Sequence, residues 1–214
     1  MLTSFVLPII LGAASKFNFP STNLTPPPET NTTEIQQKPK SDSFFFKALA
    51  NLIGYVESHG SGGYNSANAG YPGDLGKNGL IRFSGRDCSK VTIGEVKNWQ
   101  RQGLIFAVGR YQMIPRTFKA AQLWAGLGDH DYFSPENQDK MLLAIIKHKR
   151  PSVLAYIKGS GNLNRAINDL AMEWAGLPTL NGYSYYSGGN KAHTSVNAVV
   201  QALQTSRQSY LQTI

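Results

Sequence analysis

The chain has 214 residues, 41% of them hydrophobic, which suits one folded domain with a real core and an appendage. Its formal net charge of +8 favours an anionic partner such as nucleic acid, acidic membrane or bacterial cell wall. Because no nucleic-acid-binding motif is present, we do not expect nucleic acid to be the partner. The single cysteine, Cys88, excludes an intramolecular disulfide, and the four histidines lack metal-ligand spacing, so we expect no metal and no other cofactor.

Residues 1–19 form an apolar N-terminal segment, most clearly from Leu2 to Ala14. This stretch is shorter than the ~20 apolar residues that a membrane-spanning helix needs. It resembles the apolar region of a signal peptide, with small residues at 12–14 where cleavage would occur, but no Lys or Arg precedes it. A peptide that contacts a membrane or docks on a partner fits equally well. Both alternatives predict an extracytoplasmic protein, whether virion-associated, periplasmic or secreted.

Residues 20–43 are interpreted as a disordered linker, because Pro, Thr, Asn, Ser and Gln dominate and large apolar residues are nearly absent. Such a segment cannot bury enough apolar surface to offset the entropy that it would lose on ordering. The prolines at 26–28 also favour an extended chain. We therefore expect the folded domain to occupy residues 44–214.

A helix is strongly indicated at the start of this domain. Ser41, Asp42 and Ser43 offer N-caps. Glu57 lies at the predicted end of the helix, before a run of glycines that stops it. The apolar residues follow the i, i+3, i+4, i+7 spacing of one buried face, and they are Phe45, Ala48, Leu49, Leu52, Ile53 and Val56.

The next part of the chain, residues 60–90, carries too many turn residues for a helix and predicts loops with short strands. Leu80–Phe83 is expected to form one strand, followed by a turn at Ser84–Gly85, as in a small hairpin. Beyond it, Thr92 and Glu95 have the spacing of a capping box, which predicts a helix to about residue 101.

The remainder predicts a helical lobe. Pro115 and Pro135 are placed to open helices, where a missing backbone N–H does no harm. Residues 141–146 are apolar on all sides, as in a buried central helix. The fold class is therefore α+β, mainly α, with a helical lobe and a small β or loop lobe. The expected helices cover residues 115–126, 135–150, 151–158, 163–175 and 194–211.

Glu57 is the candidate general acid. A carboxyl group at a helix end, beside an apolar stripe and before a glycine-rich loop, is partly buried, and burial raises its pKa toward the range of a proton donor. Glycosidases place their acid in such an environment. A solvent-facing glutamate at a helix end is the common alternative, and position alone does not separate the two.

Several polar and aromatic residues suit a sugar-binding cleft. Arg110, Tyr111 and Gln112 precede a predicted helix, where Tyr and Gln can stack on and hydrogen-bond a sugar; a loop with Tyr111 in the core is the alternative. The loops also supply aromatic rings and amides, and binding residues tend to lie in loops. The candidates among them are Tyr64, Asn65 and Tyr183.

A glycosidase that uses two carboxylates needs a partner for Glu57. Asp74 and Asp87 lie in the loop lobe and are the candidates, although neither stands out. Asp169 and Glu173 lie on a predicted helix and are expected to pair with solvent or with a cation instead.

Together these motifs resemble the lysozyme superfamily. Glu57-Ser58 followed by Gly62–Asn65 is similar to the catalytic motif of lytic transglycosylases, and Gly109–Gln112 is similar to a segment of the bacteriophage lambda-type endolysins. The order and spacing of further motifs over roughly residues 54–185 are also similar. These motifs are Phe133–Pro135, Gln138-Asp139, Ala166-Ile167, Trp174, Leu177-Pro178 and Gly182-Tyr183.

The resemblance implies a lysozyme-like fold that cuts the β-1,4 bond between N-acetylmuramic acid and N-acetylglucosamine in bacterial peptidoglycan. A lytic transglycosylase of this kind needs no second carboxylate, because the muramic acid C6 hydroxyl attacks C1 and gives a 1,6-anhydro product. Glu57 is then the catalytic acid. Residues expected to bind substrate are Ser58, Tyr64, Asn65, Arg110, Tyr111, Gln112 and Tyr183.

Two alternatives to transglycosylation stay open. One is a hydrolytic muramidase that uses Asp74 or Asp87 as a second carboxylate. The other is a glycan-binding structural protein of a virion or envelope machine. Residues 1–43 have no counterpart in a simple endolysin, and they suggest assembly into such a machine or contact with a membrane.

Overall fold

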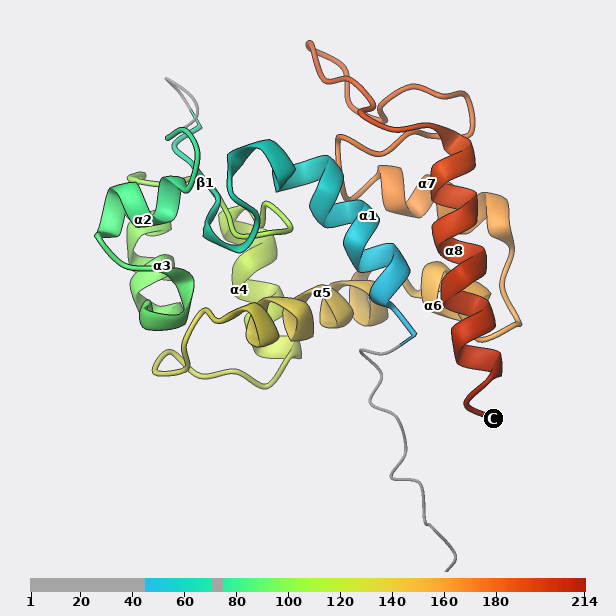
Figure 1. Cartoon of the computed structure of the whole chain (residues 1–214), viewed down its shortest axis with the longest axis horizontal. Helices are drawn as coiled ribbons and strands as arrows, with labels where there is room; N and C mark the ends of the chain where they lie inside the picture. Colours follow the sequence, from blue (N-terminus) through green and yellow to red (C-terminus); the bar gives the residue numbers. More distant parts are fainter. Residues whose placement is uncertain (1–44, 71–74) are drawn as a thin grey trace, which may run out of the picture. The chain divides into compact units, whose positions relative to one another are not determined.

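Helices dominate residues 45–70 and 75–214, which this computed structural model describes and which all lie within the unit Lys38–Ile214 (Figure 1). The predicted α+β, mainly α class is confirmed. The α-helices are α1 (Lys47–Ser58), α2 (Gly79–Ser84), α3 (Ile93–Arg101), α4 (Pro115–Trp124), α5 (Pro135–Lys149), α6 (Pro151–Ile157), α7 (Leu163–Ala171) and α8 (Val196–Leu211). The 3-10 turns are η1 (His59–Ser61), η2 (Gly63–Asn65) and η3 (Cys88–Lys90).

The described chain has one two-stranded antiparallel sheet of very short strands, β1 (Ala67–Asn68) and β2 (Ala107–Val108), besides isolated bridges. Ala67 pairs with Val108, and Asn68 pairs with Ala107. The pair joins segments that are far apart in sequence, so it closes the loop lobe that contains α2 and α3.

Helix α5 is the buried centre of the unit, as its apolar sequence predicts. Met141 and Ile146 are fully buried, and the helix packs against α4 and α6. Ser134 caps it by accepting a hydrogen bond from the backbone N–H of Asn137, and Pro135 occupies its first turn. Figure 1 shows α5 across the middle of the unit, with α6 to α8 on one side and α2 and α3 on the other.

Helix α1 packs along α8 and thereby places the end of α1. Leu49 and Ile53 on its apolar face are fully buried, as predicted. The start of the helix differs from the expected polar cap. Its N-cap is Phe46, a buried residue that forms no side-chain cap, and Ser41–Ser43 lie outside the described residues. Helix α1 therefore begins after a buried aromatic residue, Phe46, and not after a polar side-chain cap.

The strand predicted at Leu80–Phe83 is wrong, because these residues lie in α2. Leu80 and Phe83 are three residues apart and so share one helix face. Leu80 is fully buried, and the ring of Phe83 meets that of Trp99 edge-on, with centroids 5.1 Å apart. Gly85 ends the helix in the left-handed conformation, with φ of 72°. The expected local hairpin is therefore replaced by a helical turn that packs on α3.

The other predicted helices are confirmed, with ends that shift by a residue or two, except that α7 ends at Ala171 rather than at Ala175. Glu173 lies in the turn that follows. Its buried carboxylate, 4% exposed, accepts from Nζ of Lys149 at 2.8 Å and from Nε of Arg150 at 2.9 Å. The predicted pairing of Glu173 with a cation is thus confirmed, and it ties the end of α7 to the end of α5.

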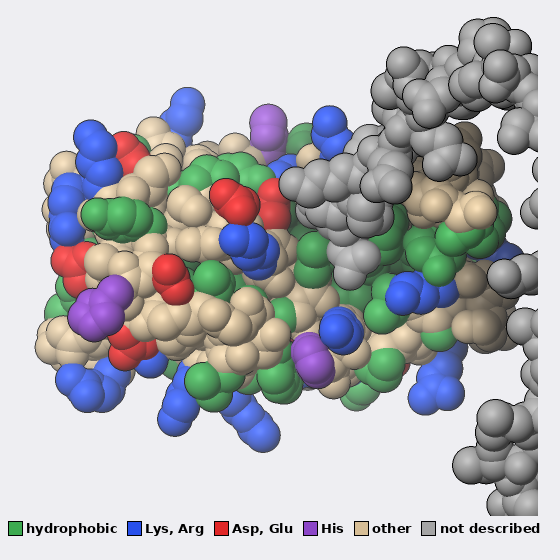
Figure 2. Space-filling view, turned by 90° about the horizontal axis from the view of Figure 1, so that it is seen from below, with side chains coloured by type: hydrophobic (Ala, Val, Ile, Leu, Met, Phe, Trp, Pro, Cys, Tyr) green, Lys and Arg blue, Asp and Glu red, His purple; other side chains and the backbone are tan. Residues whose placement is uncertain are grey.

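Basic side chains outnumber acidic ones in the chain, 21 to 13. Figure 2 shows lysine and arginine side chains projecting around the margin of one face, while acidic side chains lie in its left half. Among the described residues, no helix combines the length and the apolar character that crossing a membrane requires. The apolar stretch Leu2–Ala14 lies outside the described residues.

Replacing Glu173 with Ala should lower the free energy of unfolding by about 3 kcal/mol, because it leaves the mostly buried Arg150 guanidinium without its carboxylate. Urea unfolding measures the change. Glu136→Ala is the matched control, since Glu136 forms an exposed pair with Lys140 and its loss should cost less than ~0.5 kcal/mol. Equal losses in the two variants would contradict the structural role of Glu173.

Candidate active site

Glu57 lies at the end of α1, where the sequence predicts it. Ile53 and Val56 point into the core, and Glu57 follows directly, so its side chain leaves the helix at the edge of the buried face. The chain then turns through η1 to Gly62, whose φ of 112° suits glycine. The carboxyl group is therefore held at a helix terminus beside apolar side chains.

The Glu57 carboxyl faces a pocket of about 280 Å³ between the end of α1 and the segment that links α7 to α8. Glu57 is the one carboxylate among the described residues that line this pocket. Two further lining residues carry basic side chains, Lys191 and His193. The complete lining is Val56, Glu57, Ala175, Gly176, Gly189, Asn190, Lys191 and His193.

Burial raises the pKa of Glu57 above its usual value. Two weaker effects oppose this rise. The backbone N–H of Gly176 donates to Oε1 of Glu57 at 3.2 Å, and a positive charge on His193 also favours the carboxylate. The balance leaves a carboxylic acid that keeps its proton to higher pH than a free glutamate does, as a general acid requires.

Gly176 makes the close approach of the turn to α1 feasible. A Cβ at this position would lie 2.4 Å from Cγ1 of Val56 and 3.0 Å from Oε1 of Glu57. Any larger residue would push the turn away from the helix and remove the hydrogen bond to Glu57. The position therefore requires glycine because of space and not because of its backbone angles.

The turn that carries Gly176 is anchored on both sides. The indole N–H of the buried Trp174 donates to the carbonyl oxygen of Tyr111 at 3.2 Å. The backbone N–H of His193 donates to the carbonyl oxygen of Gly176 at 2.8 Å, and the hydroxyl of Ser184 donates to that of Ala175 at 2.7 Å. These contacts fix the wall of the pocket opposite Glu57.

A network centred on Asp139 of α5 fixes the neighbouring loops. Its carboxylate accepts from the hydroxyl of Tyr64 at 2.9 Å and from the hydroxyl of Tyr111. Arg110 donates from Nη1 to the Tyr64 hydroxyl at 2.7 Å and from Nη2 to Oδ1 of Asn51 on α1 at 2.8 Å. Burial and the nearby Asp139 raise the pKa of both tyrosines. The network thus joins α1, η2, the segment after β2, and α5.

Two predicted substrate contacts are not placed at an accessible surface. Tyr111 is 1% exposed, and its ring lies in the core. Ser58 is 2% exposed, and its hydroxyl lies 3.0 Å from the carbonyl oxygen of Gly54 and 2.8 Å from that of Arg110. Both side chains therefore support the site from the interior of the protein, and neither is accessible to a substrate.

Gln112 and Asn65 are half-buried and support the loops near the site. Gln112 has a left-handed φ of 47°, which is unusual for a residue with a side chain, and its amide donates to Gly109 and to the hydroxyl of Ser66. Asn65 accepts from the backbone N–H of Cys88 at 2.7 Å. Both keep some exposed surface, so a substrate contact stays a prediction for them.

Arg110, Tyr64 and Tyr183 differ in how far a substrate can reach them. Arg110 and Tyr64 are half-buried in the Asp139 network, but Arg110 also lines a second hollow beside α1. Tyr183 is 76% exposed on the segment that links α7 to α8. Since that segment continues to His193 in the Glu57 pocket, Tyr183 stays a candidate for sugar stacking.

Asp87, one of the two predicted second carboxylates, does not lie in the Glu57 pocket. It caps η3 by accepting from the backbone N–H of Ser89 at 2.8 Å. Asp74 lies outside the described residues. Within residues 45–70 and 75–214, no group of three or more His, Cys, Asp or Glu side chains could hold a metal ion.

Sequence reasoning did not assign roles to Gly176, His193 or Asp139. Gly176 and Asp139 adjoin or belong to motifs that the sequence analysis noted, but a motif does not show which side chains meet. His193 had no such signal, because it lies in a glycine-rich and polar segment without periodicity. Their proximity to the site arises only when α5 and the α7–α8 link pack beside α1.

The chain is similar to one family of known proteins. Residues 47–205 match the model of a protein family described as Endolysin. The match covers more than half of the 214 residues, and it runs from the first residue of α1 into α8. No curated protein and no solved structure matches the chain significantly.

The raised pKa of Glu57 has a consequence for stability. The stability that protonated Glu57 contributes is present below the pKa of an unfolded-chain glutamate and is lost as pH rises through the raised folded pKa. Glu57→Gln keeps a neutral side chain, so its free energy of unfolding should match that of the wild type at acid pH and exceed it at neutral pH. Urea unfolding over a pH series measures this, with the exposed Glu136→Gln as control. A difference that does not grow with pH would refute the burial of the Glu57 charge.

Proposed function

The chain belongs to the Endolysin family, since the family model matches residues 47–205, and on this premise we propose that it is a lytic transglycosylase with Glu57 as its acid. Endolysins are phage enzymes that degrade the bacterial cell wall, so peptidoglycan is the substrate. The proposed bond is the β-1,4 link between N-acetylmuramic acid and N-acetylglucosamine. The observation that carries this proposal is the Glu57 carboxyl, half-buried in a pocket with no other carboxylate among its described lining residues.

The proposed reaction begins with proton donation. The protonated form of Glu57, which burial favours, donates to the glycosidic oxygen, and the bond from C1 of the muramic acid to that oxygen breaks. The departing N-acetylglucosamine leaves as an alcohol at its C4 hydroxyl. The Glu57 carboxylate formed in this step is stabilised by the N–H of Gly176 and by a positive charge on His193.

The second step uses a nucleophile from the substrate. The C6 hydroxyl of the muramic acid attacks C1, and its proton returns to Glu57. A 1,6-anhydro ring forms, and the acid is restored for another cycle. This route needs one carboxyl group, in keeping with the pocket lining. A hydrolase would need a second carboxylate near Glu57, for which Asp87 is not placed and Asp74 lies outside the described residues.

The remaining assignments are also proposals. Asn65, Arg110, Gln112, Tyr64 and Tyr183 are candidates for sugar contacts around the pocket. Because peptidoglycan lies outside the cytoplasmic membrane, we infer that the enzyme acts there. Tethering or export through residues 1–43 stays a prediction, since these residues lie outside the described part of the chain.

Mass spectrometry of peptidoglycan digested by the wild type and by Glu57→Gln tests the reaction. We expect the wild type to release muropeptides that end in 1,6-anhydro-muramic acid, lighter by one water than hydrolysis products. Glu57→Gln should release none, because an amide cannot donate the proton, while still binding the glycan. Reducing-end products would show hydrolysis and direct attention to Asp74 and Asp87. Equal release by the variant would remove Glu57 from the mechanism, and no release by the wild type would favour a binding or structural protein.

Gly176→Ala should lower the rate of peptidoglycan cleavage about 100-fold, because the added methyl group displaces the turn and Glu57 from each other. Turbidity loss of a peptidoglycan suspension measures the rate. Gly128→Ala is the matched control, since a Cβ there makes only ordinary contact, 3.6 Å from Oδ2 of Asp131. A Gly176→Ala enzyme as fast as the control would show that the close approach does not position Glu57.

A further inference from the structure

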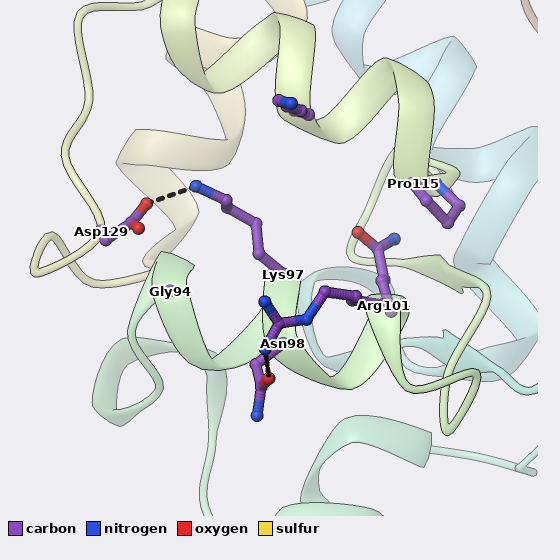
Figure 3. A pocket seen from close by; sticks show the side chains of 8 residues that line it. Gly94, Lys97, Asn98, Arg101, Pro115 and Asp129 are labelled. Carbon is purple, nitrogen blue, oxygen red and sulfur yellow. Dashed lines mark hydrogen bonds and ion pairs between the residues drawn. The ribbon is translucent and has the colours of Figure 1, made fainter.

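A second pocket lies away from Glu57, between α3 and the start of α4 (Figure 3). Its volume is about 570 Å³, and it shares no lining residue with the Glu57 pocket. We call it the basic pocket, because three of its lining residues are Lys97, Arg101 and Lys119. The other lining residues are Gly94, Asn98, Gln100, Pro115 and Asp129.

The positive charge of the basic pocket is largely uncompensated. Asp129 is the one acidic residue of the lining, and it pairs with Lys97, with Oδ1 2.6 Å from Nζ. Arg101 donates from Nη2 to the neutral Oδ1 of Asn98 at 2.7 Å. Lys119 is exposed, and its side chain makes no hydrogen bond or ion pair with a described residue. Two cations therefore face the pocket without an anionic partner among the described residues.

Helix stability explains only part of this arrangement. Arg101 lies in the last turn of α3, where a positive charge favours the helix. Lys97 lies four residues before Arg101 on the same face, and Lys119 lies on α4. Figure 3 shows Lys97 reaching from α3 toward Asp129, while Arg101 runs back along α3 to Asn98. A negatively charged ligand would supply the anionic partner that Arg101 and Lys119 lack among the described residues.

The pocket is built on a rigid floor. Gln100 is buried, and its amide donates to the carbonyl oxygens of Phe106 and Met113 at 2.8 and 2.9 Å. These bonds hold α3 against the segment that leads into α4. The ring of Pro115 and the aliphatic stems of the basic residues supply an apolar wall. A preformed hollow with apolar walls and a few charged groups is typical of a ligand site.

We propose that the basic pocket binds the carboxylate-bearing peptides that branch from the peptidoglycan glycan, and so holds the enzyme on its substrate apart from the Glu57 site. The guanidinium of Arg101 can pair with a carboxylate through two parallel hydrogen bonds, and Lys119 adds a second charge. A short peptide fits the volume and the mixed lining better than a bare phosphate does. The inference rests on the proposed function, because it takes peptidoglycan as the substrate.

Sedimentation with insoluble peptidoglycan tests the proposal. The full chain carries Glu57→Gln so that the polymer stays intact, and it is compared on native peptidoglycan and on glycan stripped of its peptides by an amidase. We expect stronger retention on the native polymer. The added double substitution Arg101→Gln and Lys119→Gln should weaken retention there about tenfold, as expected for the loss of charge-assisted contacts, and should have no effect on the stripped glycan.

Lys147→Gln with Arg165→Gln is the matched control, because it removes the same two charge types from exposed positions outside the basic pocket. Equal weakening by the control would reduce the effect to net charge and overturn the proposal. Equal retention on native and stripped polymer would overturn it as well. So would competition by soluble polyphosphate where the free peptide does not compete, since the ligand would then be a phosphate polymer.

Cleavage by the chain without Glu57→Gln separates this proposal from the proposed function. If that protein releases no muropeptides, the proposed function fails. If it cleaves, while retention does not depend on the peptides, only the peptide site fails. The Arg101 and Lys119 double variant should cleave short soluble glycan strands at the unchanged rate, and thermal unfolding at an unchanged temperature would show that it is folded.

Discussion

The candidate active site depends on the contact between Gly176 and the end of α1. Because this residue has no Cβ, its backbone comes close enough to Val56 to close the pocket over Glu57 and to reach the carboxyl with an N–H. Partial burial raises the pKa of Glu57, whereas the hydrogen bond from the N–H of Gly176 lowers it. This one contact thus contributes both to the burial that raises the pKa of Glu57 and to the hydrogen bond that lowers it.

The rest of the site is held by a half-buried polar network centred on Asp139. Asp139 on the central helix α5 accepts from Tyr64 and Tyr111, and Arg110 links this group to α1. A buried polar network rigidifies a structure when its members are satisfied. The loops of this network are therefore anchored to the central helix α5, which suits a site that must keep its geometry during proton transfer.

Much of the fold could be predicted because its signals are local. The capping box at Thr92, the prolines that open α4 and α5, and the apolar face of α1 all act within a few residues, and each predicted helix is present. The prediction failed at Leu80–Phe83, where a short apolar run fits a strand or a helix equally well. In the folded chain this run is helical, and the ring of Phe83 packs on that of Trp99 of α3.

By itself, the sequence determined the helical framework and the position of Glu57 at a helix end, since both follow from periodicity and capping. Only the tertiary structure decided the surroundings of that carboxyl group. Gly176 lies 119 residues further along the chain than Glu57, and no local pattern reports contacts over such separations. For the same reason the sequence left Tyr111 open between the cleft and the core, and it gave no sign that Ser58 lies in the interior. Burial is a property of the packed helices and not of the motif.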